Sequence, residues 1–442
     1  MARQLFGTDG VRGRAGEFLT AELALALARA AVMLCDDQHP QVLIVRDTRE
    51  SGEMLEAAMA AGITAAGGDV LIGGVLPTPA APLLLRRHQL QLAAVISASH
   101  NPYEDNGIKF FAADGFKLSD EAEAAIESRL GMPEAMPEHN GRVRTLHGAL
   151  EDYLRELHTR FDGLDLTGRR VLLDCAHGAT YRAAPEIFRR LGAEVDVIAD
   201  QPNGRNINAG VGSTHLDALT EAIVAGSYDI GFAFDGDGDR VLAVDAKGQV
   251  VDGDELIAIA AKHLKQAGAL NGGGVAVTVM TNYGFHTAME EAGIEVATTQ
   301  VGDRYVNEEL RNRGWRLGGE QSGHLIDLGF GPCGDGIASA LLTMEALAGA
   351  DLGERAGMHK LPQKLVNIRA ASRELLAAAM DTAAVRDAID AAAAALEGRG
   401  RVLVRASGTE PLIRVMVEAP TAEETGRICS ELSATVELAL GA

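Results

Sequence analysis

The feature that most constrains the fold is one structural plan that occurs three times along the 442-residue chain. Each copy contains a strand rich in β-branched residues, a polar or glycine-containing loop, a helix and a second strand. The copies begin at Val42, Val171 and Val275. A strand–helix–strand unit of this kind places its two strands in parallel. We therefore predict three related α/β domains with mixed sheets.

The C-terminal part of the chain follows a different plan. An alanine-rich helix over 383–398 leads to two strands, 401–407 and 411–419, and then to a final helix. Two strands joined by a short turn pair antiparallel, so we predict a smaller α+β domain here. The predicted domains are 1–151, 152–252, 253–365 and 366–442.

The bulk composition limits the classes of partner. Hydrophobic residues make up 47% and charged residues 23% of the chain, as in a soluble globular protein. The net charge of −22 argues against nucleic acid as a partner, because the surface as a whole would repel a polyanion. Small phosphate esters remain compatible, since a few arginines can form a local positive pocket.

Cysteine spacing and the first residues bear on location. Cys35, Cys175, Cys333 and Cys429 are far apart and form no CxxC pair, so we predict neither a zinc cluster nor a disulfide framework. The first residues lack the apolar core of a signal peptide, and the apolar stretch 21–35 carries two charges. We therefore predict a cytoplasmic protein with no membrane partner.

A strand expected over 90–99 ends in small hydroxyl residues, a histidine and an Asn-Pro pair. The Asn-Pro pair turns the chain, so Ser99 and His100 lie at the end of a strand, where α/β proteins hold their reactive groups. The segment lacks the G-x-S-x-G pattern of serine hydrolases, and His100 is poorly placed to be the base for its neighbour Ser99. We predict that Ser99 accepts a phosphoryl group instead.

Three carboxylates alternate with glycines in "DGDGDR", which follows another expected strand. Asp235, Asp237 and Asp239 could fold around one hard cation, magnesium or calcium. An EF-hand is excluded, because Arg240 and Ala246 occupy the positions of its glycine and glutamate. A solvated acidic turn is the alternative, but three close carboxylates repel one another unless a cation holds them. A phosphoserine could complete the same site.

The segment "RASGTEPLIR" combines two arginines, two hydroxyls and a glycine in one turn and the strand after it. Turn amides, hydroxyls and guanidinium groups are the donors that a phosphate dianion requires. The alternative is an ordinary hairpin turn with an ion pair to Glu410. The candidate phosphate-binding residues are Arg405, Ser407, Gly408, Thr409 and Arg414.

The glycine-flanked segment "GGEQSGHLI" contains Glu320, Ser322 and His324. On an extended segment alternate side chains point to the same side, which suits a row of sugar hydroxyls. A polar connector between domains is the alternative.

Together these segments resemble the α-D-phosphohexomutases. Seven motifs occur in the family's order over almost the whole chain: "FGTDGVRG", "SASHNPYEDNGIKFF", "PNGRNINAGVGSTH", "DGDGDR", "VGDRYV", "GEQSGH" and "RASGTEPLIR". The resemblance implies four domains around one central cleft, in agreement with three repeats and a distinct C-terminal domain.

The resemblance also implies roles for single residues. Ser99 is similar to the family's phosphoserine, and it would bind one Mg²⁺ per chain together with Asp235, Asp237 and Asp239. The other matches are the positive groups beside the phosphoserine, Arg12 and Arg240; the pair that supports proton transfer, Lys109 and His100; the readers of sugar hydroxyls, Glu320 and Ser322, with His324; and the clamp for the phosphate that is not reacting, Arg405, Ser407, Gly408, Thr409 and Arg414. As a base, Lys109 would need a pKa well below about 10.4, which we expect burial and nearby arginines to produce.

Gln321, the segment 212–215 and the "GTDGVRG" opening resemble the branch of the family that acts on amino sugars. The implied reaction is the reversible conversion of glucosamine 6-phosphate to glucosamine 1-phosphate through a phosphoserine enzyme and glucosamine 1,6-bisphosphate. It would supply UDP-N-acetylglucosamine in a bacterial cytosol. The alternatives are a glucose or mannose phosphate mutase and a catalytically silent sugar-phosphate sensor.

Two expectations concern larger-scale behaviour. Because the two phosphates of the bisphosphate must exchange places, we expect the C-terminal domain to move about a hinge near 366–372. The sequence leaves the oligomeric state open, with a homodimer as one candidate.

Overall fold

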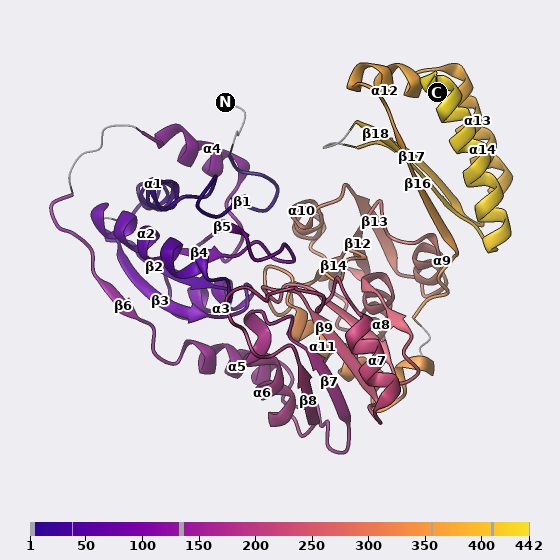
Figure 1. Ribbon diagram of the computed structural model, residues 1–442. Coiled ribbons are helices and arrows are strands. Elements are labelled where there is room, and N and C mark those ends of the chain that lie inside the picture. Colours follow the sequence, from indigo (N-terminus) through magenta and orange to yellow (C-terminus); the bar gives the residue numbers. More distant parts are fainter. Residues whose placement is uncertain (1–4, 38, 132–136, 355–356, 408–410, 442) are drawn as a thin grey trace. The chain divides into compact units, whose positions relative to one another are not determined.

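The computed structural model describes residues 5–37, 39–131, 137–354, 357–407 and 411–441 (Figure 1). The chain forms two compact units. The first unit contains Met1–Val279 and Glu295–Ala356, and the second contains Met280–Ile294 and Gly357–Ala442.

The N-terminal part of the first unit contains a six-stranded sheet in the order β1-β5-β4-β2-β3-β6. Here β2 pairs in parallel with β3 and β4, whereas β5 is antiparallel to β4 and β1. Its strands are β1 (Val11–Arg14), β2 (Gln41–Arg46), β3 (Asp69–Val75), β4 (Leu92–Ile96), β5 (Asp105–Ala112) and β6 (Val143–Thr145). Its helices are α1 (Ala21–Val32), α2 (Ser51–Ala65), α3 (Ala80–Arg87) and α4 (Asp120–Arg129). Leu27, Leu55, Met59 and Ile63 belong to the hydrophobic core of this part.

The middle part of the first unit contains a five-stranded sheet in the order β11-β10-β9-β7-β8. Here β7 is parallel to β8 and β9, and β10 is antiparallel to β9 and β11. Its strands are β7 (Arg170–Asp174), β8 (Glu194–Ile198), β9 (Ile230–Phe234), β10 (Val241–Asp245) and β11 (Val250–Val251). Its helices are α5 (Ala149–Arg160), α6 (Ala183–Arg190) and α7 (Asp217–Ala225).

The last part of the first unit contains a four-stranded sheet in the order β13-β12-β14-β15. Here β12 is parallel to β13 and β14, and β15 is antiparallel to β14. Its strands are β12 (Gly274–Thr278), β13 (Glu295–Thr299), β14 (Leu317–Gly319) and β15 (Leu325–Asp327). Its helices are α8 (Gly253–Gln266), α10 (Asp303–Arg313) and α11 (Gly336–Leu347).

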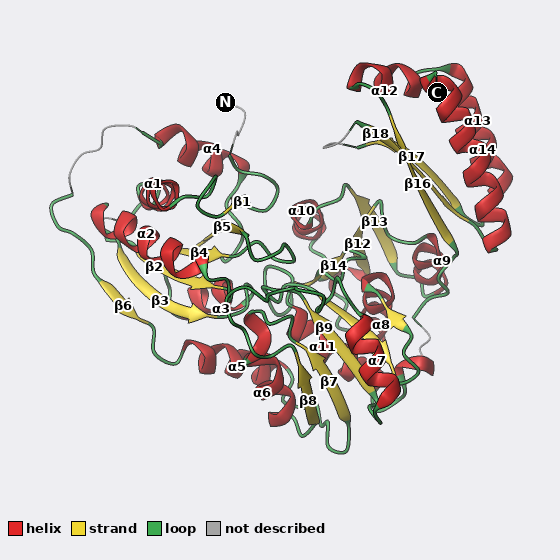
Figure 2. Cartoon of the chain, viewed as in Figure 1, coloured by secondary structure: helices red, strands yellow, loops and turns green. Residues whose placement is uncertain are grey.

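The second unit contains a three-stranded antiparallel sheet in the order β16-β18-β17 (Figure 2). Its strands are β16 (Gln363–Arg369), β17 (Arg401–Ala406) and β18 (Leu412–Glu418). Its helices are α9 (Tyr283–Glu291), α12 (Arg373–Met380), α13 (Ala383–Leu396) and α14 (Ala422–Leu440). Ile413, Val415, Leu432 and Val436 lie in its hydrophobic core.

The predicted fold class is confirmed: each of the three repeats contains two parallel strands, and the C-terminal sheet is antiparallel. Strand β16 crosses the predicted boundary between 365 and 366 and pairs with β18 along its whole length, and the second unit begins again at Gly357. The hinge expected near 366–372 stays a prediction.

Two buried strands position the polar segments that concern function. Every residue of β4 and of β9 is buried. A strand that is covered on both faces is apolar at each position, which explains the runs "LAAVI" and "IGFAF". Each run is followed by one of the candidate functional segments, so the ends of β4 and β9 are where the site is to be sought.

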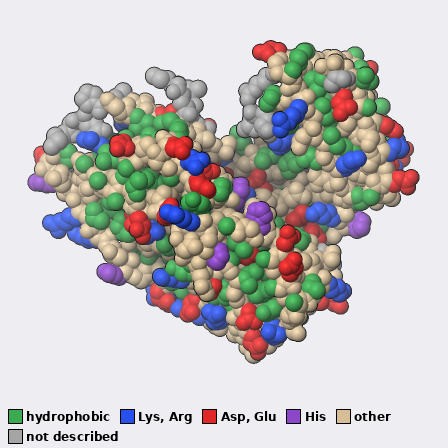
Figure 3. Space-filling view, viewed as in Figure 1, with side chains coloured by type: hydrophobic (Ala, Val, Ile, Leu, Met, Phe, Trp, Pro, Cys, Tyr) green, Lys and Arg blue, Asp and Glu red, His purple; other side chains and the backbone are tan. Residues whose placement is uncertain are grey.

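Charged side chains of both signs are interspersed on the face of the molecule in Figure 3, and neither sign forms one continuous patch there. Among the described residues, no helix combines the length and the apolar character needed to cross a membrane.

Candidate functional site

Ser99 lies just beyond the end of β4 and is only 1% exposed. Its φ of 52° falls in the left-handed region, which residues other than glycine seldom adopt. Its Oγ donates a hydrogen bond of 2.6 Å to Asp235 Oδ2. The predicted phosphoryl acceptor and the predicted metal loop are therefore in direct contact, although they are 136 residues apart in sequence.

His100 is closer to Ser99 than its place in the sequence suggested. Its Nδ1 lies 3.3 Å from Ser99 Oγ, so the expectation that it is poorly placed to serve Ser99 is wrong. The left-handed backbone at Ser99 replaces the extended geometry in which neighbouring side chains point apart. Burial, together with the guanidinium groups of Arg240 and Arg12, lowers the pKa of His100.

Asp235, Asp237 and Asp239, here called the acidic triad, follow β9 and are all buried. Each offers a carboxylate oxygen within 4.8 Å of the others. Burial and repulsion by Asp239 and Asp237 raise the pKa of Asp235 well above its usual value. Asp237 Oδ1 has no hydrogen-bond partner among the described residues. Buried, mutually repelling carboxylates with an unused oxygen fit a hard dication such as magnesium.

Arg240 directly follows the acidic triad, and its backbone N–H donates to Asp235 Oδ1 at 3.2 Å. Arg12 lies on β1 and forms an ion pair with Asp9. Both guanidinium groups are close enough to His100 to lower its pKa. The two predicted positive groups therefore lie in the region of the phosphoryl acceptor.

Lys109 lies on β5 and is 2% exposed. Its Nζ donates to Asp237 Oδ2 at 2.9 Å and lies 3.5 Å from Asp9 Oδ2 and 3.7 Å from Asp239 Oδ2. Burial alone would lower the pKa of Lys109, but the three carboxylates outweigh burial and raise it. The expected low pKa is therefore wrong, since that expectation considered the arginines and not the aspartates that contact the ammonium group.

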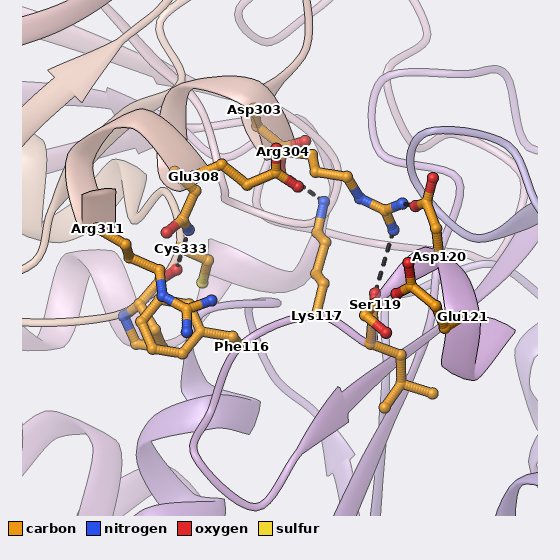
Figure 4. A pocket seen from close by; sticks show the side chains of 13 residues that line it. Phe116, Lys117, Ser119, Asp120, Glu121, Asp303, Arg304, Glu308, Arg311 and Cys333 are labelled. Carbon is orange, nitrogen blue, oxygen red and sulfur yellow. Dashed lines mark hydrogen bonds and ion pairs between the residues drawn. The ribbon is translucent and has the colours of Figure 1, made fainter. Parts of the chain in front are cut away.

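Sequence reasoning did not select Lys117 or Asp303, which extend this network of charges. Lys117 Nζ pairs with Asp9. It also pairs, at 2.6 Å, with Asp303 Oδ2 (Figure 4). Asp303 Oδ2 lies in turn 3.6 Å from His324 Nε2. Basic and acidic side chains thus alternate around a closed set, which consists of Lys109, Asp9, Lys117, Asp303, His324 and Asp239.

Asp9 and Asp303 lie inside two of the family motifs, "FGTDGVRG" and "VGDRYV", so a signal for them was present in the sequence. Lys117 had no such signal, because nothing local distinguishes a lysine in an ion-pair network from a solvated one. Lys117 and Asp303 also line a cavity of about 260 Å³ (Figure 4). No member of the acidic triad lines this cavity.

The "GGEQSGH" segment is a turn between β14 and β15, not the extended segment that we expected. The Glu320 N–H donates to His324 O, and the Gly323 N–H donates to Glu320 O, both at 3.0 Å. The pairing of the two strands forces the chain to reverse here. Ser322 is exposed at the turn, whereas His324 is buried with Nδ1 3.7 Å from Asp239 Oδ1.

In the second unit, β17 and β18 form the predicted hairpin. Arg405 lies directly opposite Arg414 in its register. Burial and the charge of Arg414 lower the pKa of Arg405. The Ser407 N–H donates to Leu412 O at 2.8 Å and closes the hairpin. The predicted Gly408 and Thr409 lie outside the described residues.

The same hairpin contains an arginine in a different setting. Arg401 lies opposite Glu418, and the two side chains form an ion pair of 3.1 Å. Glu418 is fully buried. In contrast, Arg405 and Arg414 form no ion pair with a carboxylate in the described part of the hairpin.

Four family models of phosphoglucomutase/phosphomannomutase match successive parts of the chain. The alpha/beta/alpha domains I, II and III match residues 3–134, 151–248 and 252–365, and the C-terminal domain matches residues 365–435. Together the matches account for most of the chain.

The chain is also similar along its whole length to curated phosphoglucosamine mutases. It is 49% identical over 438 residues to the one from Pelotomaculum thermopropionicum, with 97% of this chain and 98% of the relative covered. It is 47% identical over 452 residues to the one from Methylobacillus flagellatus, with 99% of both chains covered.

Solved structures show the same fold at lower identity. A phosphoglucomutase/phosphomannomutase family protein from Burkholderia thailandensis gives a TM-score of 0.82 at 23% identity, with 98% of this chain and 97% of that chain covered. The N-acetylphosphoglucosamine mutase of Aspergillus fumigatus, in complex with GlcNAc-6P and magnesium, gives 0.69 at 19% identity, with 99% and 96% covered. The resemblance inferred from the motifs is confirmed: the chain belongs to the phosphoglucomutase/phosphomannomutase family, the α-D-phosphohexomutases, and within it to the phosphoglucosamine mutases.

Proposed function

We propose that this chain interconverts glucosamine 6-phosphate and glucosamine 1-phosphate through phosphorylated Ser99 and glucosamine 1,6-bisphosphate, and so supplies UDP-N-acetylglucosamine synthesis. The support from relatives is the full-length similarity to phosphoglucosamine mutases. Structural neighbours were solved with GlcNAc-6P and with glucose 1,6-bisphosphate, which supports sugar phosphates as the substrate class.

The hydrogen bond between Ser99 Oγ and Asp235 Oδ2 is the observation that carries the proposal. It joins a hydroxyl that can accept a phosphoryl group to a buried acidic triad. A sensor that only bound sugar phosphates would need the arginines, but it would have no use for a buried serine against three carboxylates. The arrangement therefore favours phosphoryl transfer over binding alone.

The acidic triad would hold one Mg²⁺, with phosphoryl oxygens on Ser99 as further ligands. When bound, the ion would supply positive charge that neutralises the oxygens of the transferring group. Arg12 and Arg240 would add positive charge beside Ser99. Because arginine stays protonated at physiological pH, their contribution does not depend on proton uptake.

A sugar hydroxyl that attacks the phosphoryl group on Ser99 must lose its proton during the transfer. In an in-line transfer that hydroxyl lies on the far side of the phosphorus from Ser99 Oγ, and its proton would pass to a phosphoryl oxygen. Ser99 Oγ must take up a proton as it leaves, and His100 Nδ1, 3.3 Å away, is within reach to supply it. Lys109 contacts Asp237 and would mainly stabilise charge at the reacting group. We therefore assign proton transfer at Ser99 to His100, and to Lys109 the stabilisation of charge beside it.

The sugar and its second phosphate would be held by two other segments. Glu320 Oε1 accepts a hydrogen bond of 3.0 Å from the Gly302 N–H, which fixes its carboxylate next to the turn that carries Ser322. We propose that Glu320 and Ser322, with His324, bind sugar hydroxyls. The clamp for the phosphate that is not reacting would consist of Arg405, Ser407, Gly408, Thr409 and Arg414.

Phosphorus NMR tests the proposal directly. The purified protein is given Mg²⁺ and a trace of glucose 1,6-bisphosphate, with glucosamine 6-phosphate and glucose 6-phosphate offered in parallel. We expect glucosamine 1-phosphate to form faster than glucose 1-phosphate. The Ser99→Ala variant, which cannot carry the phosphoryl group, should lose at least about 1,000-fold in kcat.

Each other outcome has a defined meaning. Faster turnover of glucose 6-phosphate would assign the chain to a glucose phosphate mutase. No turnover of either sugar would favour the sensor or another hexose. Full activity in Ser99→Ala would exclude the phosphoserine route.

A further inference from the structure

Unusual backbone conformations gather around Ser99. Eight non-glycine residues in the described part of the chain have a positive φ. Gln89, Ala348 and Glu397 follow the last turns of α3, α11 and α13, where a left-handed residue is an ordinary helix ending. The remaining residues with a positive φ are Ser99, Ala176, His177, Ala199 and Asn208.

Hydrogen bonds connect these residues to one another. The His177 N–H donates to Ala199 O at 2.6 Å, and the Asn208 N–H donates to Ala176 O at 2.9 Å. Asn208 Nδ2 then donates to Ser99 O at 2.9 Å. Left-handed backbone at such residues persists only where the surroundings determine it, and it tends to occur at functional sites. The strained segments after β7 and β8 therefore support the conformation of Ser99.

A buried arginine completes the support of the serine loop. Arg49 is fully buried, and its Nη2 donates to Ser99 O and Asn101 O, both at 2.9 Å. Its Nε donates to Asp47 Oδ2 at 2.8 Å. Ser97 Oγ accepts the Ser99 N–H at 3.0 Å and donates to Asp47 Oδ2 at 2.5 Å. The backbone N–H and C=O of Ser99 are thus both held by side chains, and not by a neighbouring strand.

Asn208 donates to the same two carbonyl oxygens as Arg49. Its Nδ2 bonds Asn101 O at 3.0 Å in addition to Ser99 O. It comes from the part of the chain that carries the acidic triad. A Cβ at Gly236, inside the triad loop, would lie 2.6 Å from Ser99 O and 2.7 Å from Asn208 Nδ2. Asn208 therefore lies where the loop that carries Ser99 packs tightly against the loop of the acidic triad. Asparagine suits this position because it tolerates its φ of 58° and supplies two N–H donors.

We infer that Asn208 is a positioning residue for phosphoryl transfer: by bonding Ser99 O and Asn101 O, it holds Ser99 in the left-handed conformation that directs Oγ to Asp235. The consequence for activity rests on the proposed function, whereas the positioning of the loop does not.

Two variants of Asn208 separate its backbone from its side chain. Asn208→Gly retains the positive φ and removes both hydrogen bonds. Asn208→Asp retains size and turns an oxygen toward two carbonyl oxygens, so it should be the more damaging of the two. Asn203→Gly, an exposed position on the same segment, is the matched control.

The first measurement is hydrogen exchange of the peptide that covers 97–103. Loss of the two hydrogen bonds should speed its exchange by at least about fivefold in Asn208→Gly, and not in Asn203→Gly. The second measurement is the kinetics with glucosamine 6-phosphate. A misdirected Oγ should lower kcat by about 10- to 100-fold and leave KM within about twofold.

Unchanged exchange in Asn208→Gly would overturn the inference whatever the kinetics show. A higher KM with unchanged kcat would also overturn it, because Asn208 would then serve substrate binding. If the wild type itself fails to turn over the sugar, the proposed function fails while hydrogen exchange still tests the positioning. If Asn208→Gly does not fold, Asn208→Ser, which retains one donor, takes its place with intermediate exchange expected.

Discussion

We propose that the acidic triad of the first unit and the arginine pair of the second unit, Arg405 and Arg414, both take part in binding phosphate groups. The charges around the two sites are arranged differently. In the first unit, cations contact the carboxylates directly, as in the 2.9 Å hydrogen bond between Lys109 and Asp237. In the second unit, Arg405 faces Arg414, and neither forms an ion pair with a described carboxylate. The first arrangement is partly compensated by cations before any ligand arrives, whereas the second leaves a repulsion that an anion would remove.

This contrast predicts different consequences for substitutions. A change in the compensated region leaves a buried charge without its partner, so it should affect both catalysis and stability. A change in the uncompensated pair should affect binding and leave stability unharmed.

The largest effect is expected for Asp237→Asn. The change removes one negative charge from the triad. Asp237 Oδ2 accepts hydrogen bonds from the Lys109 ammonium at 2.9 Å and from the Thr78 hydroxyl at 2.6 Å, and both donors lose their charged acceptor. We expect kcat to fall by about 1,000-fold and the Mg²⁺ concentration for half-maximal rate to rise. Steady-state rates over a magnesium titration measure both quantities. Asp196→Asn, at an exposed residue of β8, is the control, and an equal loss there would contradict the assignment.

The next largest effect is expected for Gly236→Ala, which tests how tightly the serine loop and the triad loop are packed. The new methyl group would lie 2.6 Å from Ser99 O, a backbone atom that cannot turn away. We expect the free energy of unfolding to fall by about 3 kcal/mol. Urea denaturation measures it. Gly163→Ala, where a Cβ would meet no atom within 4 Å, should stay within about 0.5 kcal/mol of wild type.

Asp335 is a buried carboxyl group that forms no ion pair with a described cation, so the pH dependence of stability tests what such compensation is worth. Asp335 is 4% exposed, and its partners are the Tyr153 hydroxyl and the Ala338 N–H. Burial outweighs these hydrogen bonds and raises the pKa of Asp335 to about 6. Because the folded pKa exceeds the unfolded value of about 3.9, its contribution to stability is complete below pH 4 and is lost as the pH rises through 6.

Asp335→Asn retains the helix cap and cannot ionise. The free energy of unfolding of wild type relative to this variant should therefore fall by about 2 kcal/mol between pH 4 and pH 7. Urea denaturation at both pH values measures the difference. A constant difference would mean that folding does not raise the pKa of Asp335.

The sequence predicts well what depends on local pattern. The apolar runs of β4 and β9 and the repeated strand–helix–strand plan place Ser99 and Asp235 at strand ends. That Ser99 and Asp235 lie next to each other could be predicted only from their chemistry, because a phosphoserine and three carboxylates can bind the same metal ion.

What the sequence did not predict depends on partners that are distant along the chain. Asp9 and Asp237 raise the pKa of Lys109, and Asp303 forms an ion pair with Lys117; none of these aspartates is close to its lysine in sequence. The left-handed backbone conformation of Ser99 could not be predicted from the sequence either. Serine has no preference for a positive φ, and the conformation is imposed by Arg49 and Asn208.

The smallest effect, and the one that tests the comparison most directly, is expected at the arginine pair. Arg414→Met retains the apolar part of the side chain and removes the charge opposite Arg405. We expect KM for glucosamine 6-phosphate to rise about tenfold, because a charge-assisted hydrogen bond to phosphate is lost. The free energy of unfolding should be unchanged or higher by about 0.5 kcal/mol, since the repulsion is relieved. Arg401→Met on the same hairpin leaves the buried Glu418 without its cation, while the Tyr283 N–H still donates to it. It should therefore lower the free energy of unfolding by about 2 kcal/mol at unchanged KM. If both variants lost stability and neither changed KM, Arg414 would be a structural residue and the uncompensated pair would not be a phosphate site.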